Sequence, residues 1–493
     1  MSRPTTHKLL IYSAKQIVQI SKNGEEVLKG IKQDQPIILN EKFGDNGETI
    51  GLSIVIDMTG RIEAVDFDDQ IKCQFRFAIF EQSLCAKGLV ILPGLIDAHT
   101  HPIWAGDRVE EFAMKQKGAT YNEITLSGGG IYKTVRETDL ASDEKLYNLL
   151  KNRLYHMMKS GTTLVECKSG YGLGLEQEMR LLTILKRAND ELPLTLSITY
   201  LGAHAVPSNT NVTTFAQEIA DSHIPFLLDA YLENKISLQN VDVFCETGYF
   251  DVENSFKILK AARRAGFNIN VHGDELTPIG SYKLVDMLRR DAHSCNVYSV
   301  DQRYYSISHL EELSQEGIEV LAKDCKFVAV LLPLTKFILG ITDKNKPPAR
   351  QLIQNDVPVA LGTDFNPSSH CYSMPIAMYT AVVTMGMTLE ESLVASTLNA
   401  AASLNMSQDY GSLERDKMGD LLVLDCSDWK HLIYQLGNHD QLINYVIKRG
   451  SIIYGRAPFR YSKGEPQTGE MIFAQKREKS LPILTKEENW LLL

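Results

Sequence analysis

The sequence predicts an α/β fold, a (β/α)8 TIM-type barrel that carries a satellite β-sandwich domain. Short apolar strands alternate with amphipathic helical segments through the middle of the chain, and β-rich segments stand on either side of that region. Alternation over such a length implies parallel strands joined by crossover helices, and about eight such units close a barrel. Polar residues directly after successive strands are a third sign, because barrel active sites gather at that face.

The first part of the chain is β-rich. Three segments have the apolar pattern of strands, namely 8–20 (KLLIYSAKQIVQI), 53–66 (SIVIDMTGRIEAVD) and 84–92 (LCAKGLVIL). A glycine turn, MTGR, separates two strands within the second segment. The stretch 32–51 is polar and rich in glycine, so we expect it to be a surface loop.

The alternation of strands and helices begins at Pro93 and continues to about Asn405. The predicted strand and helix pairs are 162–170 with 175–190, 194–204 with 213–223, and 241–248 with 253–266, followed by strands at 267–275, 327–333 and 357–364. An open, doubly wound sheet is the alternative architecture. It is less favoured because none of the predicted strands is followed by a Gly-rich fingerprint of the kind that binds dinucleotides.

Beyond Met418 the chain returns to β character in the segment GDLLVLDCSDW. We expect this segment to join the N-terminal strands, so that the barrel is inserted within a β-sandwich domain. The expected divisions are 1–92 and 406–460 for the two parts of the sandwich, 93–405 for the barrel and 461–493 for a C-terminal tail.

The composition argues against some classes of partner. The net charge of −10 disfavours nucleic acid, since phosphate binding needs a basic surface. No apolar stretch is long enough to span a bilayer, and the start, MSRPTTHKLLIYSAKQ, lacks the apolar segment of a signal peptide. The cysteines are scattered without a CxxC pair, which indicates a reducing compartment. We therefore expect a cytoplasmic protein with no membrane partner.

Two histidines stand one residue apart shortly after the apolar run 89–92, which a Pro-Gly pair closes. On a β-strand, side chains at i and i+2 point the same way, so His99 and His101 are expected to face one point. On a helix they would lie on opposed faces. Two imidazoles that converge at a strand end are suitable ligands for a metal ion.

Two further strand ends offer metal ligands, His272 in NVHGDE and Asp364 in ALGTDFNPSS. Three neutral imidazoles and one carboxylate suit Zn²⁺ or Fe²⁺ and leave a position for water. Taken alone, a histidine after a strand is ordinarily a hydrogen-bonded loop residue, and an aspartate before Asn-Pro ordinarily forms a turn. Their order, with the paired histidines after the first barrel strand and the aspartate after the last, favours a metal site.

That order resembles the amidohydrolase superfamily of metal-dependent barrel hydrolases, of which PGLIDAHTHP is a specific mark. Further segments resemble the imidazolonepropionase family within it: DAHTHPIWAGDRVEEFAMKQKGATYNEI, GGGI, KSGYGL, LGAHAVP, VHGDEL and LGTDFNPSS. The resemblance runs from about residue 85 to 425. It implies that water opens the five-membered lactam of 4-imidazolone-5-propanoate, a step of histidine breakdown, to give N-formimidoyl-L-glutamate.

The same resemblance implies a cofactor and an assembly. The cofactor is one divalent metal per subunit, Zn²⁺ or Fe²⁺/Fe³⁺, with His99, His101, His272 and Asp364 as ligands, and the assembly is a homodimer. Lys168 stands where some members of the superfamily carbamylate a lysine to bridge two metals. In ECKSGYGL it follows the one-metal pattern, so a structural role is expected.

The resemblance also implies catalytic roles. Glu275 matches the acid/base group that moves the proton of water to the ring nitrogen, a role that Asp364 could share. His204 matches the histidine that hydrogen-bonds the ring carbonyl of the substrate. His309 corresponds to a proton-relay position, although the segment 287–307 resembles an insertion and blurs the alignment there.

The substrate that the resemblance implies has a propionate group, so its binding requires a positively charged side chain. Arg108 matches the family residue that grips this carboxylate, and a guanidinium can do so with two hydrogen bonds. The other implied contacts to the substrate, besides His204 and Glu275, are Tyr121, Tyr171, Asn366, Ser368 and Ser369. The resemblance supports the role of Ser368 least, because NPSS lacks the glycine that often follows Asn-Pro in the family.

Two other functions stay open on the sequence. Another cyclic-amide or amidine hydrolase of the superfamily, or a nucleobase deaminase, would share the metal ligands but would not need Arg108 with Tyr121 and Tyr171. Turnover of guanine or cytosine would favour that reading. A non-catalytic scaffold on the same fold would be expected to have lost ligands, and metal analysis would separate it from an enzyme.

Overall fold

The computed structural model describes residues 5–118, 123, 128–294, 303–323, 326–339 and 346–456. Tyr121 and the predicted tail 461–493 lie outside the described residues. Among the described helices, none combines the length and the apolar character that crossing a membrane requires.

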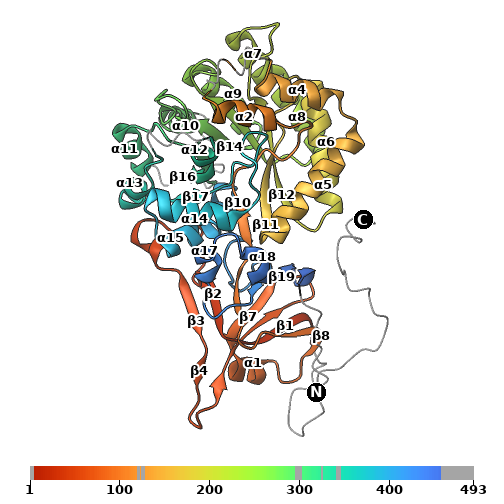
Figure 1. The fold of residues 1–493 in the computed structure, drawn as a ribbon, viewed down its shortest axis with the longest axis vertical. Helices are drawn as coiled ribbons and strands as arrows, with labels where there is room; N and C mark the ends of the chain where they lie inside the picture. Colours follow the sequence, from red (N-terminus) through yellow and green to blue (C-terminus); the bar gives the residue numbers. More distant parts are fainter. Residues whose placement is uncertain are drawn as a thin grey trace.

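The largest part of the molecule is a barrel of eight parallel strands in sequence order, which confirms the predicted fold class (Figure 1). Its strands are β10 (Leu95–Asp97), β11 (Thr162–Lys168), β12 (Thr195–Ala203), β13 (Asn240–Cys245), β14 (Asn268–Gly273), β15 (Tyr305–His309), β16 (Phe327–Leu331) and β17 (Val359–Leu361). Their side chains are almost all buried, as parallel strands covered on both faces require.

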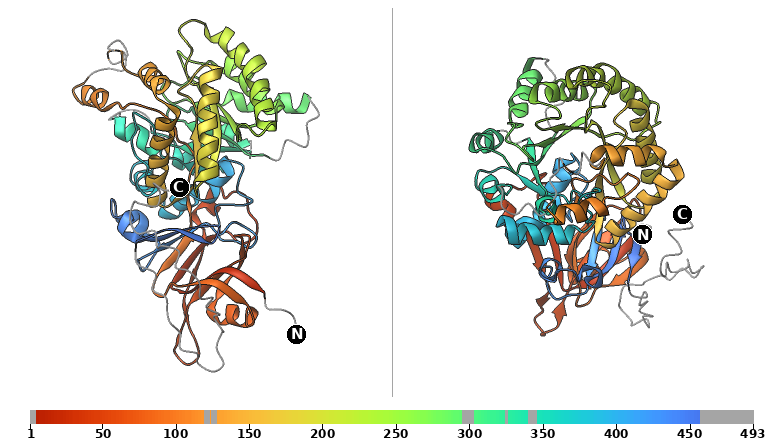
Figure 2. Two further views of the ribbon diagram at one scale, coloured as in Figure 1. Left: turned by 90° about the vertical axis from the view of Figure 1, so that its right-hand side faces the viewer. Right: turned by 45° about the horizontal axis from the view of Figure 1, so that its top comes forward.

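Helices surround the barrel, as the right-hand view of Figure 2 shows. They are α2 (Val109–Gln116), α4 (Ile131–Leu140), α5 (Asp143–Lys159), α6 (Leu175–Glu191), α7 (Val212–Glu218), α8 (Ile224–Leu232), α9 (Val252–Arg264), α10 (Lys283–Ser294), α11 (Gln315–Lys323), α12 (Pro333–Leu339), α13 (Ala349–Gln354), α14 (Met374–Met385), α15 (Leu389–Ala395) and α16 (Leu398–Ser403). Helix α9 illustrates how they form. The Asp251 side chain caps its first turn, and Ile258, Leu259 and Ala262 bury one face.

The barrel closes at its carboxyl-terminal mouth. Strands β10 and β17 stand at the two ends of the sheet order, and residues just beyond them are joined through the backbone. The N–H of Asp364 donates to the carbonyl of His99 at 3.0 Å, and the N–H of His101 donates to the carbonyl of Phe365 at 2.8 Å. Closure of the barrel therefore places Asp364 beside His99 and His101, although these residues are distant in the sequence.

Two further sheets are built from the terminal parts of the chain, the red-orange and blue ribbons below the barrel in Figure 1. One has the order β7-β6-β1-β8 and the other β20-β19-β18-β9-β2-β3. Their strands are β1 (Thr6–Ala14), β2 (Gln16–Ile20), β3 (Ile37–Asn40), β6 (Leu52–Ile56), β7 (Ile62–Phe67), β8 (Ile79–Cys85), β9 (Val90–Pro93), β18 (Leu421–Leu424), β19 (Ile443–Lys448) and β20 (Ser451–Gly455). Apolar side chains from both sheets, including Ile54 and Val423, form one core.

The N-terminal and C-terminal segments share a sheet, because β9 pairs antiparallel with β18. This agrees with the expectation that the terminal segments join. The divisions at 92, 405 and 460 stay predictions. The short helices of these terminal parts are α1 (Asp68–Gln74), α17 (His431–Tyr434) and α18 (His439–Leu442). Helix α1 contacts β6 and β7, and α18 contacts β19.

The prediction of a surface loop at 32–51 is wrong. The chain there forms the end of a 3-10 helix, η1 (Gly30–Asp34), then β3 and a short hairpin of β4 (Lys42–Phe43) and β5 (Thr49–Ile50). Strand β3 pairs antiparallel with β2 and so extends the larger sheet. The stretch is polar overall, but it contains a short apolar run, 37–39, which is long enough to form an edge strand.

Candidate metal centre and substrate site

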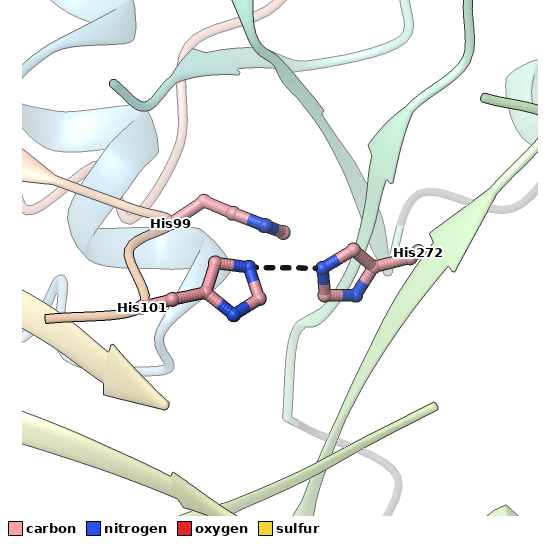
Figure 3. A group of neighbouring side chains, drawn as sticks. All are labelled: His99, His101 and His272. Atoms are coloured by element: carbon pink, nitrogen blue, oxygen red, sulfur yellow. Dashed lines mark hydrogen bonds between the residues drawn. The ribbon is translucent and has the colours of Figure 1, made fainter. Parts of the chain in front are cut away.

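The structure brings the four predicted metal ligands to one point at the mouth of the barrel. Nε2 of His99 and Nε2 of His101 lie 3.7 Å and 3.6 Å from Oδ1 of Asp364. Nε2 of His272, in β14, lies 3.3 Å from Nε2 of His101. Figure 3 shows the three imidazoles turned toward one another, two from the end of β10 and one from the facing strand.

These residues fit a divalent metal. His99, His101, His272 and Asp364 are all buried, with at most 4% of any residue exposed. Nε2 of His99 is buried and has no hydrogen-bond partner. A buried polar atom of this kind destabilises the folded protein unless it binds a ligand, such as a metal ion. Burial is the main cause that lowers the pKa of all three histidines, so each ring is neutral and has a lone pair to donate.

A fifth side chain, His309 at the end of β15, stands beside the same point. Ring nitrogens of His99 and His309 and an oxygen of Asp364 all lie within 4.8 Å of one another, as do the three nitrogens of His99, His101 and His272.

The backbone at this site is strained. His309, Leu310 and Asp364 have positive φ values, 75°, 67° and 50°. Such backbone is strained for residues other than glycine, and strain of this kind is common at functional sites.

Each of three ligands is oriented by a polar neighbour on its far side. Oγ of Ser308 lies 2.9 Å from Nδ1 of His99, and Oδ2 of Asp242 lies 3.1 Å from Nδ1 of His272. The hydroxyl of Thr335 donates to Oδ2 of Asp364 at 2.8 Å. Partners of this kind fix the orientation of a ligand, and the carboxylate of Asp242 also raises the basicity of His272.

Lys168 is part of a buried ion network. Its Nζ lies 2.6 Å from Oε1 of Glu166 and 2.7 Å from Oδ2 of Asp242, and all three side chains are fully buried. Although burial acts the other way, these two carboxylates raise the pKa of Lys168. The lysine is therefore held as an ammonium ion, which agrees with the structural role expected for it and not with a carbamate.

The predicted proton-transfer residues, Glu275 and His309, lie in a chain of titratable side chains that ends at Glu311. Oε2 of Glu275 lies 3.6 Å from Nε2 of His309, whose Nδ1 lies 3.6 Å from Oε2 of Glu311. Burial raises the pKa of Glu275 to about 7. Against the effect of burial, Glu275 and Glu311 raise the pKa of His309 to about 10.

His204 lies against the metal site. Its ring stacks on that of His101, with centroids 5.1 Å apart, and it contacts Tyr171 at 5.4 Å. Nδ1 of His204 lies 2.8 Å from the carbonyl oxygen of Gly170. A carbonyl only accepts, so Nδ1 carries the proton, and burial lowers the pKa of the ring to about 3. The neutral ring therefore presents Nε2 as a hydrogen-bond acceptor.

The structure also brings together the predicted contacts for the propionate. Arg108 donates from Nη1 to Oγ of Ser368 at 2.7 Å, and from Nε and Nη2 to Oγ1 of Thr134 at 3.0 Å and 2.9 Å. Its nearest carboxylate, Oε2 of Glu111, lies 3.9 Å from Nε. The guanidinium is thus held by hydrogen bonds to two hydroxyls and by a long ion pair with Glu111.

The two other predicted residues of this loop have different surroundings. Asn366 uses its side chain inside the loop: its Oδ1 accepts from the N–H groups of Ser368 and Ser369, and its Nδ2 donates to the carbonyl of Asp364. This is turn chemistry that shapes the loop. The hydroxyl of Ser369 is buried without a hydrogen-bond partner.

Several residues that orient the site were not predicted from the sequence. Asp242 stands between two valines of β13, and a charged residue in such a buried run is a signal that could have found it. Ser308 stands in a strand with other polar residues and has no comparable signal. Thr335, in the first turn of α12, has no such signal. Glu311 was not predicted either, although it stands only two residues after His309, which was.

The family model that matches this chain is described as the amidohydrolase family, and it covers residues 90–455. Similar solved structures include an adenosine deaminase from Xanthomonas campestris with bound zinc (TM-score 0.63, 16% identity, covering 91% of this chain and 93% of that one). A guanine deaminase from C. acetobutylicum with bound guanine is also similar (TM-score 0.62, 15% identity, 90% and 99%). At these identities they show the fold alone. The fold and the site define an amidohydrolase.

Curated relatives narrow this class. The chain is 43% identical to the probable imidazolonepropionase of Nematostella vectensis and 44% identical to that of Homo sapiens, in each case over 91% of this chain and 99% of the relative. It is 41% identical to that of Dictyostelium discoideum, over 91% and 98%. The chain belongs to the imidazolonepropionase family of amidohydrolases.

Proposed function

We propose that this chain hydrolyses 4-imidazolone-5-propanoate to N-formimidoyl-L-glutamate. The observation that carries the proposal is the meeting of His99, His101, His272 and Asp364 at one buried point, in a chain of this family. The supporting observation is Arg108, whose guanidinium donates to the hydroxyls of Thr134 and of Ser368, a residue of the loop after Asp364, and whose ion pair with Glu111 is long, at 3.9 Å.

The reaction adds water across one amide bond of the ring. The hydroxyl group of water adds to the carbonyl carbon, the bond from that carbon to the ring nitrogen breaks, and the nitrogen receives a proton. The site must therefore activate water, stabilise charge on the carbonyl oxygen and deliver a proton to the leaving nitrogen.

A divalent metal, when bound, lowers the pKa of water and stabilises negative charge on a carbonyl oxygen. His99, His101, His272 and Asp364 are the residues that would hold it. We propose one ion per subunit, Zn²⁺ or Fe²⁺/Fe³⁺, because three imidazoles and a carboxylate suit either metal.

Glu275 is the proposed carrier of the proton. A carboxyl group with a pKa of about 7 can both take and release a proton near neutral pH. His309, held between Glu275 and Glu311, is the proposed relay beside it. Asp364 is the alternative carrier, and its hydrogen bond from Thr335 leaves Oδ1 facing the histidines.

His204 is proposed to contact the ring of the substrate through Nε2. Because its Nδ1 proton is directed to Gly170, the neutral ring would accept a hydrogen bond there, which suits a ring N–H of the substrate. Donation to the ring carbonyl, the role that the family resemblance implies, would require a protonated ring. Tyr171 lies against His204 and His101 and is the proposed phenol donor, with Tyr121 proposed on sequence alone.

Arg108 is proposed to bind the propionate, with Ser368 and Ser369 beside it and Asn366 shaping their loop. A homodimer and a cytoplasmic location are further proposals, which the family membership and the scattered cysteines support. The acidic net charge supports the proposal that neither nucleic acid nor membrane is a partner.

The test is an assay of purified protein with freshly generated imidazolone propionate, together with metal analysis of the same sample. We expect ring opening and close to one equivalent of metal per chain. Turnover of guanine or cytosine without ring opening would instead support a nucleobase deaminase. Protein that binds no metal and turns over none of these compounds would support a non-catalytic scaffold.

Arg108→Ala tests the carboxylate clamp. Loss of a charge-assisted contact worth about 1.5–3 kcal/mol should raise KM roughly 10- to 100-fold and change kcat less. Arg136→Ala, which removes an exposed arginine from α4, is the matched control. A wild-type kcat/KM in the Arg108 variant would show that the assignment is wrong.

A further inference from the structure

Glu178 is a buried carboxylate that the proposed mechanism does not use. It lies in the first turns of α6 and is 0% exposed. Its Oε2 accepts from the N–H of Gly170 at 3.1 Å, and its Oε1 accepts from the N–H groups of Gly172 and Leu173 at 2.7 Å and 2.9 Å. One side chain thus binds three backbone donors of the loop that follows β11.

This loop, residues 170–173, supplies two groups to the proposed substrate site. The carbonyl of Gly170 accepts the Nδ1 proton of His204 and so determines which ring nitrogen faces the site. Tyr171 lies in the same loop, is 3% exposed and contacts the rings of His101 and His204. A shift of the loop would therefore move both groups.

The backbone of the loop needs an external restraint. Gly170 and Leu173 have φ values of 83° and 60°, a conformation that is unfavourable for leucine. A Cβ atom at Gly172 would lie 2.6 Å from the backbone nitrogen of Glu178, so the loop is pressed against the helix. The three hydrogen bonds to the carboxylate hold this conformation in place.

We propose that Glu178 is a positioning residue for substrate recognition, which acts by fixing the 170–173 loop and, through the Gly170 carbonyl, the orientation of His204. The inference rests on the proposed function, because it takes His204 and Tyr171 as contacts of the substrate. It involves no contact of Glu178 with the substrate or with the metal ligands.

The test compares Glu178→Gln with Glu176→Gln, the same change at an exposed position two residues away on the same helix. An amide keeps the shape but replaces one accepting oxygen with a donor, so it opposes the N–H groups that it faces. We expect kcat/KM of Glu178→Gln to fall about 10- to 100-fold, since small misplacements of site groups cost that much. Glu176→Gln should match the wild type.

Two further measurements separate positioning from loss of the fold. Metal content should be the same in both variants and the wild type, and amide hydrogen exchange should accelerate in the peptide that spans 169–175 but not in those that cover β10 and β14. If Glu178→Gln does not accumulate as folded protein, Glu178→Asp, which keeps the charge, should show a smaller loss with the same local exchange.

The possible failures are distinguishable. A wild type that does not open the imidazolone ring overturns the proposed function. A wild type that opens it, with a Glu178 variant equal to the Glu176 variant in kcat/KM, overturns only the positioning role. A loss of activity that follows loss of metal, or exchange that accelerates throughout the barrel, also contradicts it.

Discussion

At the scale of single residues, the candidate centre depends on side chains that do not touch the metal position. Asp242 shows this most directly. Its Oδ2 faces Nδ1 of His272 on one side and Nζ of Lys168 on the other, at 3.1 Å and 2.7 Å. Although burial opposes it, these neighbours lower the pKa of Asp242, so the group is a permanent carboxylate. A fixed negative charge behind His272 directs Nε2, with its lone pair, to the metal position.

Asp242→Asn is therefore expected to weaken metal binding by about 10- to 100-fold, as losses of such partners generally do. Affinity can be measured by competition with a chromophoric chelator. Asp229→Asn, which changes an exposed aspartate of α8, should leave the affinity unchanged. Equal affinity of the Asp242 variant and the wild type would mean that His272 is oriented by other means.

At the scale of elements, the closure of the barrel between β10 and β17 involves side chains that the sequence did not reveal. At the start of β17, the backbone N–H and carbonyl of Val359 form hydrogen bonds with side chains from other parts of the chain. Its N–H donates to Oε1 of Gln33 at 3.3 Å, and its carbonyl accepts from Nε2 of Gln33 at 3.1 Å and Nδ2 of Asn399 at 3.0 Å. The segment that precedes β3 therefore completes the barrel wall.

Gln33→Ala should lower the free energy of unfolding by about 1–3 kcal/mol, because it leaves the buried N–H of Val359 without a partner, while the carbonyl keeps its bond from Asn399. Gln33 is 0% exposed, and Nε2 also donates to the carbonyl of Glu391 at 3.3 Å. Chemical denaturation measures the change. Gln35→Ala, at an exposed position of the same segment, is the control and should alter stability little. A Gln33 variant as stable as the control would show that water or Asn399 replaces the glutamine.

At the scale of the whole molecule, periodicity predicted the barrel and the joined terminal strands, because buried parallel strands and amphipathic helices leave strong patterns. The four proposed ligands could be singled out from the sequence because each stands at a strand end, and their role as ligands stays a prediction. The orienting residues were missed, since Asp242 and Thr335 acquire their roles only through the packing of distant elements. Strand β3 was missed for a related reason: a short edge strand gains its stability from its neighbour β2 and leaves little pattern of its own.

If the four proposed ligands hold one ion, that ion would link strands across the barrel in addition to its role as a cofactor. His99 and His101 follow β10, His272 lies in β14, and Asp364 follows β17, so one ion would tie three strands together. A ligand that binds only the folded state stabilises it by about 2.7 kcal/mol at one hundred times its dissociation constant. Removing metal with a chelator should therefore lower the Tm of the wild type by a few degrees, and adding Zn²⁺ should restore it.

His272→Ala distinguishes this effect from unspecific ion binding. The variant should lose metal and activity together, and its Tm should no longer respond to Zn²⁺ or to the chelator. His431→Ala, in α17, removes a histidine outside the barrel and should keep the full response of the wild type. If the Tm of the His272 variant still rose with Zn²⁺ as much as that of the wild type, the stabilising ion would lie elsewhere. The mouth would then be closed between β10 and β17 by the backbone hydrogen bonds that join His99 and His101 to Asp364 and Phe365, and β14 would be held by its pairing with β13 and β15.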